Sequence, residues 1–130
     1  MFSKHDIRRN ACQLFGKQAK TGYDWWWHSF TAINEKTGEE KPFYIEFFLC
    51  NPSLASEEPI FGDLAAKKKP SYLMVNVGTW GETHKQLHRF FGYKQAEINM
   101  GVPFEVKADD CYMSETLTYG SMDIGAVEAP

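Results

Sequence analysis

The sequence has few of the features that mark redox, covalent or nucleic-acid function. It contains only three cysteines, which are widely spaced and odd in number: Cys12, Cys50 and Cys111. This spacing predicts neither a CxxC motif nor a disulfide framework, and it favours reduced thiols in a cytoplasmic protein. The only basic run is Lys67–Lys69, and the net charge is −3. Because nucleic-acid binding normally needs a basic face or stripe, we expect no nucleic-acid partner.

Long apolar runs and targeting segments are also missing. No apolar stretch approaches the roughly 20 residues that a membrane-spanning helix requires, so the sequence predicts no membrane span. Residues 1–10 are polar and charged, and they resemble neither a secretory signal nor a membrane anchor.

The usual motifs for metals and cofactors are absent as well. His84 and His88 are four residues apart, but in a strand, where we expect them, they lie too far apart for easy chelation. Asp109 and Asp110 are adjacent, and a strand there would turn their side chains to opposite faces rather than into a two-carboxylate site. There is no glycine-rich phosphate loop and no nucleophile elbow. We therefore predict no metal and no cofactor.

What the sequence does contain is aromatic side chains, most densely in Tyr23–Phe30 with three consecutive tryptophans. Side chains alternate along a strand, so Trp25 and Trp27 point one way while Trp26 and His28 point the other. Both faces of such a strand need cover, as inside a barrel or a sandwich. With 130 residues and 43% hydrophobic residues, the chain is long enough for one domain with a real core.

The pattern of elements predicts an antiparallel β protein behind one short helix. The helix is expected over 6–17, and the long stretch 52–70 is expected to be a loop. A turn at 35–39, with Gly38 at positive φ, joins the first two strands into a hairpin. Residues 96–106 are ambiguous, and the tail from Gly120 onward is expected to fray. Five strands are predicted, over residues 23–34, 43–50, 71–79, 85–91 and 108–117.

The register of this hairpin decides what surrounds His28. A three-residue loop, Lys36–Gly38, would pair Glu35 with Glu39 and place His28 opposite Glu46. One face would then carry a mostly aromatic, partly titratable set: Trp26, His28, Phe30, Tyr44, Glu46 and Phe48. Such a face resembles the wall of a cavity for an apolar ligand, with His28 and Glu46 as a proton-transfer pair.

Alternatives remain at each of these positions. The His28–Glu46 pair could be a structural hydrogen bond, or it could orient a ligand. A four-residue loop would shift the pairing by one, so that Glu46 faces Trp27 and His28 faces Ile45. Asn76, in the third strand, is either a hydrogen-bonded core residue or a ligand contact.

Residues 22–31 and 43–52 resemble the first hairpin of a lipocalin-like family that includes tocopherol cyclases and hydroxyneurosporene synthases (carotenoid hydratases). The resemblance continues more weakly through 70–75 and 78–81. It implies an antiparallel β-barrel and cofactor-free chemistry, in which a proton is delivered to an alkene of an isoprenoid-type substrate. Members normally carry two lipocalin-like halves, so this chain is expected to be the first part of a larger two-barrel protein.

Together these observations predict a single all-β domain over 1–130, an antiparallel lipocalin-like barrel or partial barrel. About five strands close a barrel with difficulty, and open edges favour pairing with a second copy, so we predict a homodimer. The leading functional hypothesis is an isoprenoid-type cyclase or hydratase domain, which is active either alone or only together with a second half. The alternatives are a non-catalytic binder of a hydrophobic small molecule and a structural, oligomerising β domain.

Overall fold

The protein is an all-β structure of two antiparallel sheets. The computed structural model describes Leu14, Lys17 and residues 22–54, 59–81, 85–99, 101–122 and 127–128. The predicted helix over 6–17 lies outside these residues except for Leu14 and Lys17, and neither of those two is helical. The described strands and 3-10 turns are β1 (Tyr23–Ile33), β2 (Glu40–Cys50), η1 (Pro52–Leu54), β3 (Tyr72–Thr79), β4 (Gln86–Phe91), η2 (Tyr93–Gln95), β5 (Ala96–Asn99), β6 (Glu105–Ala108), β7 (Cys111–Ser114), β8 (Thr118–Tyr119) and β9 (Val127–Glu128).

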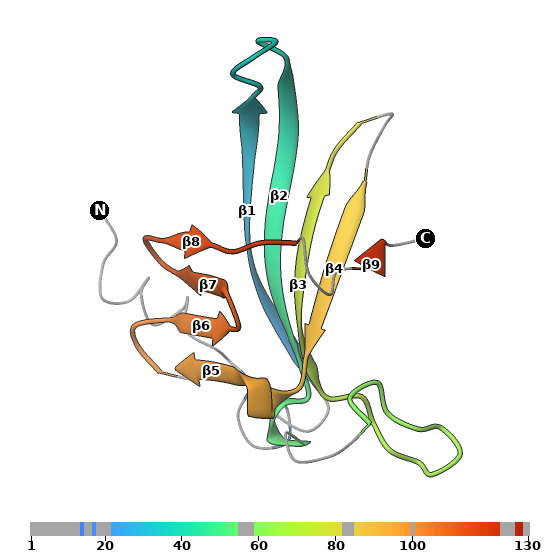
Figure 1. Cartoon of the computed structure of the whole chain (residues 1–130). Helices are drawn as coiled ribbons and strands as arrows, with labels where there is room; N and C mark the ends of the chain where they lie inside the picture. The colour runs from blue at the N-terminus through green and yellow to red at the C-terminus, as the bar shows by residue number, and fades with distance from the viewer. Residues whose placement is uncertain are drawn as a thin grey trace.

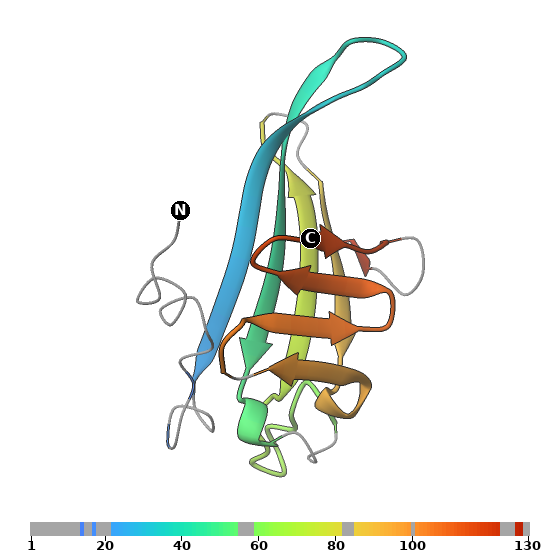
Figure 2. The ribbon, with the colours of Figure 1, turned by 90° about the vertical axis from the view of Figure 1, so that its left-hand side faces the viewer.

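The two sheets differ greatly in strand length. The first has the order β1-β2-β3-β4-β9 and contains the long strands, and the second has the order β5-β6-β7-β8. The short second sheet lies crosswise over one face of the first, as Figures 1 and 2 show. We call this covered side of the first sheet the inner face and its opposite side the outer face. The all-β antiparallel prediction is confirmed, but among the described residues the sheets do not join into a closed barrel.

The first hairpin has the register of the four-residue loop. Ile33 pairs with Glu40, and the Asn34 amide donates to the Glu39 carbonyl at 2.8 Å, which leaves residues 35–38 as the loop. The Asn34 side-chain Oδ1 accepts a hydrogen bond of 2.9 Å from the amide of Lys36, and this bond closes the turn. Gly38 has a φ of 73°, as predicted. The predicted three-residue loop is wrong because Asn34 caps the turn one residue earlier.

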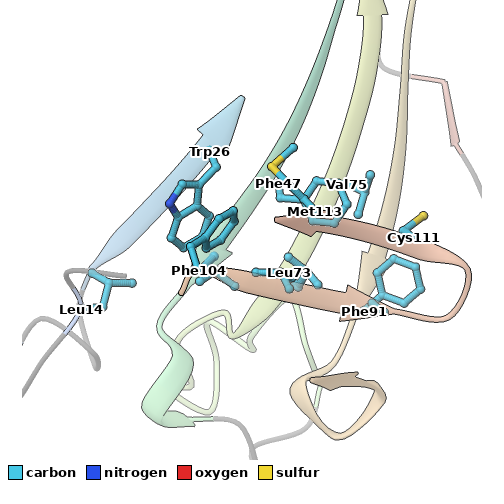
Figure 3. Close-up of a cluster of buried hydrophobic side chains, with 12 residues drawn as sticks. Leu14, Trp26, Phe47, Leu73, Val75, Phe91, Phe104, Cys111 and Met113 are labelled. Carbon is cyan, nitrogen blue, oxygen red and sulfur yellow. The ribbon is translucent and has the colours of Figure 1, made fainter. Parts of the chain in front are cut away.

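The core lies between the inner face and the second sheet. Trp26 on β1 stacks on Phe104, with ring centroids 4.1 Å apart, and only 8% of Trp26 is exposed. Figure 3 shows this stack beside the other buried side chains of the cluster. Along β6 and β7 the core residues alternate with more exposed positions, as expected for strands with one buried side. The cluster comprises Leu14, Trp26, Phe47, Leu49, Leu73, Val75, Phe91, Phe104, Val106, Ala108, Cys111 and Met113.

The strand predicted over 108–117 is confirmed only for β7 (Cys111–Ser114), because the chain reverses at Asp109–Asp110. Ala108 pairs with Cys111, so these two aspartates form a two-residue turn between β6 and β7. Asp109 has a φ of 52°, a conformation that Asp tolerates better than most residues. The ambiguous stretch 96–106 contributes β5 and the start of β6.

Arg89 on β4 ties the two sheets together. Its guanidinium reaches Asp109 at 2.8 Å and Asp110 at 2.6 Å, and it donates to the Ser121 carbonyl at 2.8 Å. Only 5% of Arg89 is exposed. The two aspartates therefore point together toward one buried cation, and not to opposite faces as predicted from the sequence.

Candidate ligand-binding site between the two sheets

The predicted site residues fall on two different faces. Trp27 lies opposite Glu46, and His28 lies opposite Ile45. Directly opposed residues of an antiparallel pair point to the same side of the sheet, so His28 and Glu46 point to opposite sides. The proposed proton-transfer pair is therefore wrong. Trp26, His28 and Phe30 lie on the inner face, whereas Tyr44, Glu46, Phe48 and Asn76 lie on the outer face.

The three inner-face residues have different surroundings. Trp26 is part of the packed core through its stack on Phe104. His28 and Phe30 lie nearer the hairpin tip and are exposed. The ring of Phe30 stacks on Phe43, with centroids 5.9 Å apart. The inner face is therefore covered by the second sheet at Trp26 and uncovered two and four residues farther along β1.

A cavity of about 320 Å³ opens between the sheets beside the core. Its floor is the inner face of β2 and β3, and its cover is β7, β8 and the segment after β8. The size falls at the lower end of the range of small-molecule sites, which is about 300–1,000 Å³. The lining residues are Ile45, Phe47, Val75, Val77, Cys111, Thr118, Tyr119, Gly120, Ser121 and Met122.

The wall of this cavity is apolar, and none of the described residues that line it carries a charge. The Cys111 thiol lies 3.7 Å from the Ser121 carbonyl, and burial raises the pKa of this thiol. A thiol with a raised pKa remains protonated near neutral pH and behaves as a small apolar group. The cavity therefore provides shape and apolar surface, and no ionised catalytic group.

The outer face carries a second hollow, which contains three of the four other predicted residues. Tyr44, Glu46 and Asn76 lie together there, beside Trp27 and Trp80. Burial raises the pKa of the Tyr44 phenol, and the Glu46 carboxylate acts in the same direction against a hydrogen bond from Asn76.

Phe48 lies outside the second hollow, within a band of stacked rings on the same face. Its ring centroid is 5.6 Å from that of Tyr23 and 6.3 Å from that of Trp25. Ligand contact by Tyr44, Phe48 and Asn76 stays a prediction.

Part of the cavity wall had no signal in the sequence. Leu73, Val75 and Val77 share one side of a strand by simple alternation, and two of these three line the cavity. Gly120–Met122, in contrast, belong to a tail that was expected to fray, yet they cover the cavity. Their position depends on a hydrogen bond that the Ser121 carbonyl accepts from Arg89, which lies 32 residues earlier in the chain.

The described ranges of the chain lack other classes of feature. No helix there is long and apolar enough to cross a membrane. No group of three or more potential metal ligands gathers in this part of the chain. Comparison with protein-family models, with curated proteins and with solved structures gives no significant match. The geometry of the two hollows is therefore the basis for the functional proposals.

Proposed function

We propose that this domain binds a hydrophobic small molecule in the cavity between the two sheets. The observation that carries the proposal is the apolar cavity of about 320 Å³ formed by Ile45, Val75 and Val77 from one sheet and Tyr119 and Met122 from the other side. A hollow of this volume corresponds to about ten water molecules, and apolar walls offer such waters few hydrogen bonds. An apolar ligand would replace poorly bound water with dispersion contacts.

The expected affinity is modest. Burying a compact ten-carbon ligand contributes about 8 kcal/mol, at about 0.8 kcal/mol for each CH₂ group. Loss of translational and rotational freedom costs at least about 4 kcal/mol. The difference of about 4 kcal/mol corresponds to a dissociation constant near 1 mM. Larger ligands that extend toward the exposed Phe30 and the half-buried Phe43 would bind more tightly.

Binding without turnover is the form of the proposal that the geometry favours. Proton delivery to an alkene needs an acid beside the substrate, and His28 and Glu46 lie on opposite sides of the sheet. The cyclase or hydratase activity implied by the family resemblance stays a prediction, to be tested on the same ligands.

The test is a panel of isoprenoid alcohols, cyclic terpenoids and fatty acids, measured by calorimetry and by displacement of a fluorescent apolar dye. We expect several members to bind, with affinity rising with chain length up to the cavity limit. Each mixture is also incubated without cofactor and its products are analysed by mass spectrometry. Turnover would support the enzyme hypothesis, and a panel without any binding would overturn the proposal.

Two variants locate the site. Val77→Phe places a ring inside the cavity and should abolish binding of the panel. Trp80→Ala, on the outer face, is the matched control and should leave the affinity unchanged. Loss of binding in Trp80→Ala with retention in Val77→Phe would place the ligand on the outer face and contradict the proposal.

A further inference from the structure

The outer face carries a second hollow that is independent of the cavity between the sheets. The ring centroids of Trp27 and Trp80 are 6.3 Å apart, and their planes are inclined by 51°. Tyr44 approaches Trp80 edge-on, with centroids 5.1 Å apart and planes inclined by 63°. The hollow is open and has a volume of about 690 Å³. Its lining residues are Trp25, Trp27, Tyr44, Glu46, Asn76, Thr79, Trp80, Gly81 and Gln86.

A row of side chains crosses this part of the outer face from β1 to β4. Trp27, Glu46, Asn76 and His88 are successive cross-strand partners, so their side chains point to the same side. Neighbouring strands are about 4.8 Å apart, so the row is about 14 Å long. The hollow therefore has an aromatic end at Trp27 and a polar floor at Glu46 and Asn76.

Asn76 supplies the observation that points to a ligand. Only 8% of this residue is exposed, and its Oδ1 has no hydrogen-bond partner in the described part of the chain. The Nε2 of His88, the next residue of the row, also has no partner there. Buried polar atoms are nearly always paired in folded proteins, so this unpaired acceptor in the lining of the hollow is available to a donor of a bound group.

Gly78 keeps the floor of the hollow in its observed shape. Tyr44 and Gly78 are cross-strand partners, and a Cβ atom at position 78 would lie 2.5 Å from the Tyr44 hydroxyl. The absence of a side chain at Gly78 therefore lets the Tyr44 ring lie across β3. Because these residues belong to strands, the floor exists before any ligand arrives, which reduces the ordering cost of binding.

We propose that this outer hollow binds a neutral polyhydroxylated ring, as found in a saccharide. The C–H groups on one side of a sugar ring fit against the electron-rich faces of Trp27 and Trp80. Its hydroxyl groups can donate to Glu46 and to the unpaired Oδ1 of Asn76, and they can accept from the Gln86 amide. A sugar hydroxyl both donates and accepts, which matches a lining that mixes the two kinds of group.

A quaternary ammonium ion is the rival ligand for inclined aromatic rings beside a carboxylate. The Glu46 carboxylate would attract such a cation. No Lys or Arg is among the described residues that line the hollow, so no positive charge there would oppose this attraction. Such a cation has no hydrogen-bonding group, however, and it would leave the Oδ1 of Asn76 without a partner. The hollow is also much larger than one trimethylammonium group. These two observations favour the saccharide.

The experiment is an NMR titration that follows the indole N–H signals of the four tryptophans. The probes are soluble oligosaccharides of glucose, xylose and mannose, each up to about 10 mM, with choline as the cationic comparison. We expect at least one oligosaccharide to shift the signals of Trp27 and Trp80 and to leave that of the buried Trp26 in place. The Trp26 signal also reports that each variant is folded.

Variants decide between the outcomes. Trp80→Ala should weaken saccharide binding at least about tenfold, while Trp80→Phe should retain part of it. Phe61→Ala is the matched control, because Phe61 is 59% exposed, packs on Tyr72 of the outer face and does not line the hollow. It should bind as the unsubstituted protein does, and so should the cavity variant Val77→Phe.

Three results would overturn the proposal. The first is a panel in which no saccharide moves the Trp27 and Trp80 signals. The second is saccharide binding that Trp80→Ala does not weaken. The third is binding of choline alone that disappears in Glu46→Gln, which would assign the hollow to a cation. Because Val77→Phe tests only the cavity between the sheets, failure of this proposal is distinguishable from failure of the proposed function.

Discussion

Replacing Arg89 by Met should loosen the contact between the two sheets without emptying the core. Methionine fills much of the volume of the arginine stem, so the change removes mainly the guanidinium group. That group makes three contacts of 2.6–2.8 Å with Asp109, Asp110 and the Ser121 carbonyl. It also lies 5.0 Å from the centroid of the Phe91 ring.

The magnitude follows from how exposed these partners are. The side chains of Asp109 and Asp110 are 67% and 48% exposed, so water replaces much of what the two carboxylates lose. The hydrogen bond to the Ser121 carbonyl contributes about 1–1.5 kcal/mol, and the contact with Phe91 about 0.5–1 kcal/mol. We therefore expect Arg89→Met to lower the free energy of unfolding by about 2 kcal/mol, which corresponds to about 6–8 °C in Tm for a domain of this size.

The assay is equilibrium unfolding in urea, followed by tryptophan fluorescence. The urea midpoint should fall while the slope m stays constant, because the surface exposed on unfolding changes little. Lys107→Met is the matched control, since Lys107 is an exposed cation on β6 of the second sheet. It should change the unfolding free energy by less than about 0.5 kcal/mol. An Arg89→Met protein as stable as this control would refute the idea that Arg89 holds the sheets together.

Three further predictions follow from other contacts. The hydrogen bond from Arg89 lowers the pKa of Asp110 below its ordinary value of 3.8, so this group stabilises the fold above that pH, and its contribution is lost as the pH falls through the lower folded pKa. Urea midpoints measured from about pH 5 to pH 2 should therefore fall less steeply in Asp110→Asn, and parallel curves would contradict this. Gly78→Ala should push Tyr44 off β3 and weaken ligand binding in the outer hollow about tenfold, as measured by the NMR titration, while binding in the inner cavity stays the same. Among the described residues β1 pairs only with β2, so light scattering after gel filtration should show a homodimer, and a monomer at micromolar concentration would contradict the prediction.

The sequence predicted the long strands well because their signals are local. Alternating and β-branched residues mark Tyr72–Thr79, and the density of aromatic residues marks Tyr23–Ile33. Gly38 indicated the turn between the first two strands. Such features depend on the preferences of a few neighbouring residues, so they are readable without knowledge of the partners.

The register of the hairpin could not be read in the same way. It depends on whether Asn34 or Glu35 closes the loop. The Asn34 side chain decides this, because it accepts a hydrogen bond from the Lys36 amide. A shift of one residue moves each side chain of one strand to the other side relative to its partner. This is why His28 and Glu46 were predicted together and lie apart.

The choice of the buried face was also beyond local reasoning. Both sides of the first hairpin carry large aromatic side chains, so alternation alone gives two candidate cores. Trp26 is buried and Trp27 is exposed because Phe104, from a segment nearly 80 residues away, stacks on Trp26. The strands of the second sheet have four residues or fewer, too short for a clear period-two pattern.

The sequence by itself therefore determined an antiparallel β domain with an aromatic first hairpin, because strand and turn preferences act over a few residues. The tertiary structure decided where ligands can bind, because each hollow is made of segments that are distant in the chain. The Arg89 contacts fix the turn at Asp109–Asp110 and the segment at Ser121 over the inner face, which completes the cavity. The pairing of β2 with β3 brings Glu46 and Asn76 together on the outer face, and the register of β1 turns His28 to the inner face.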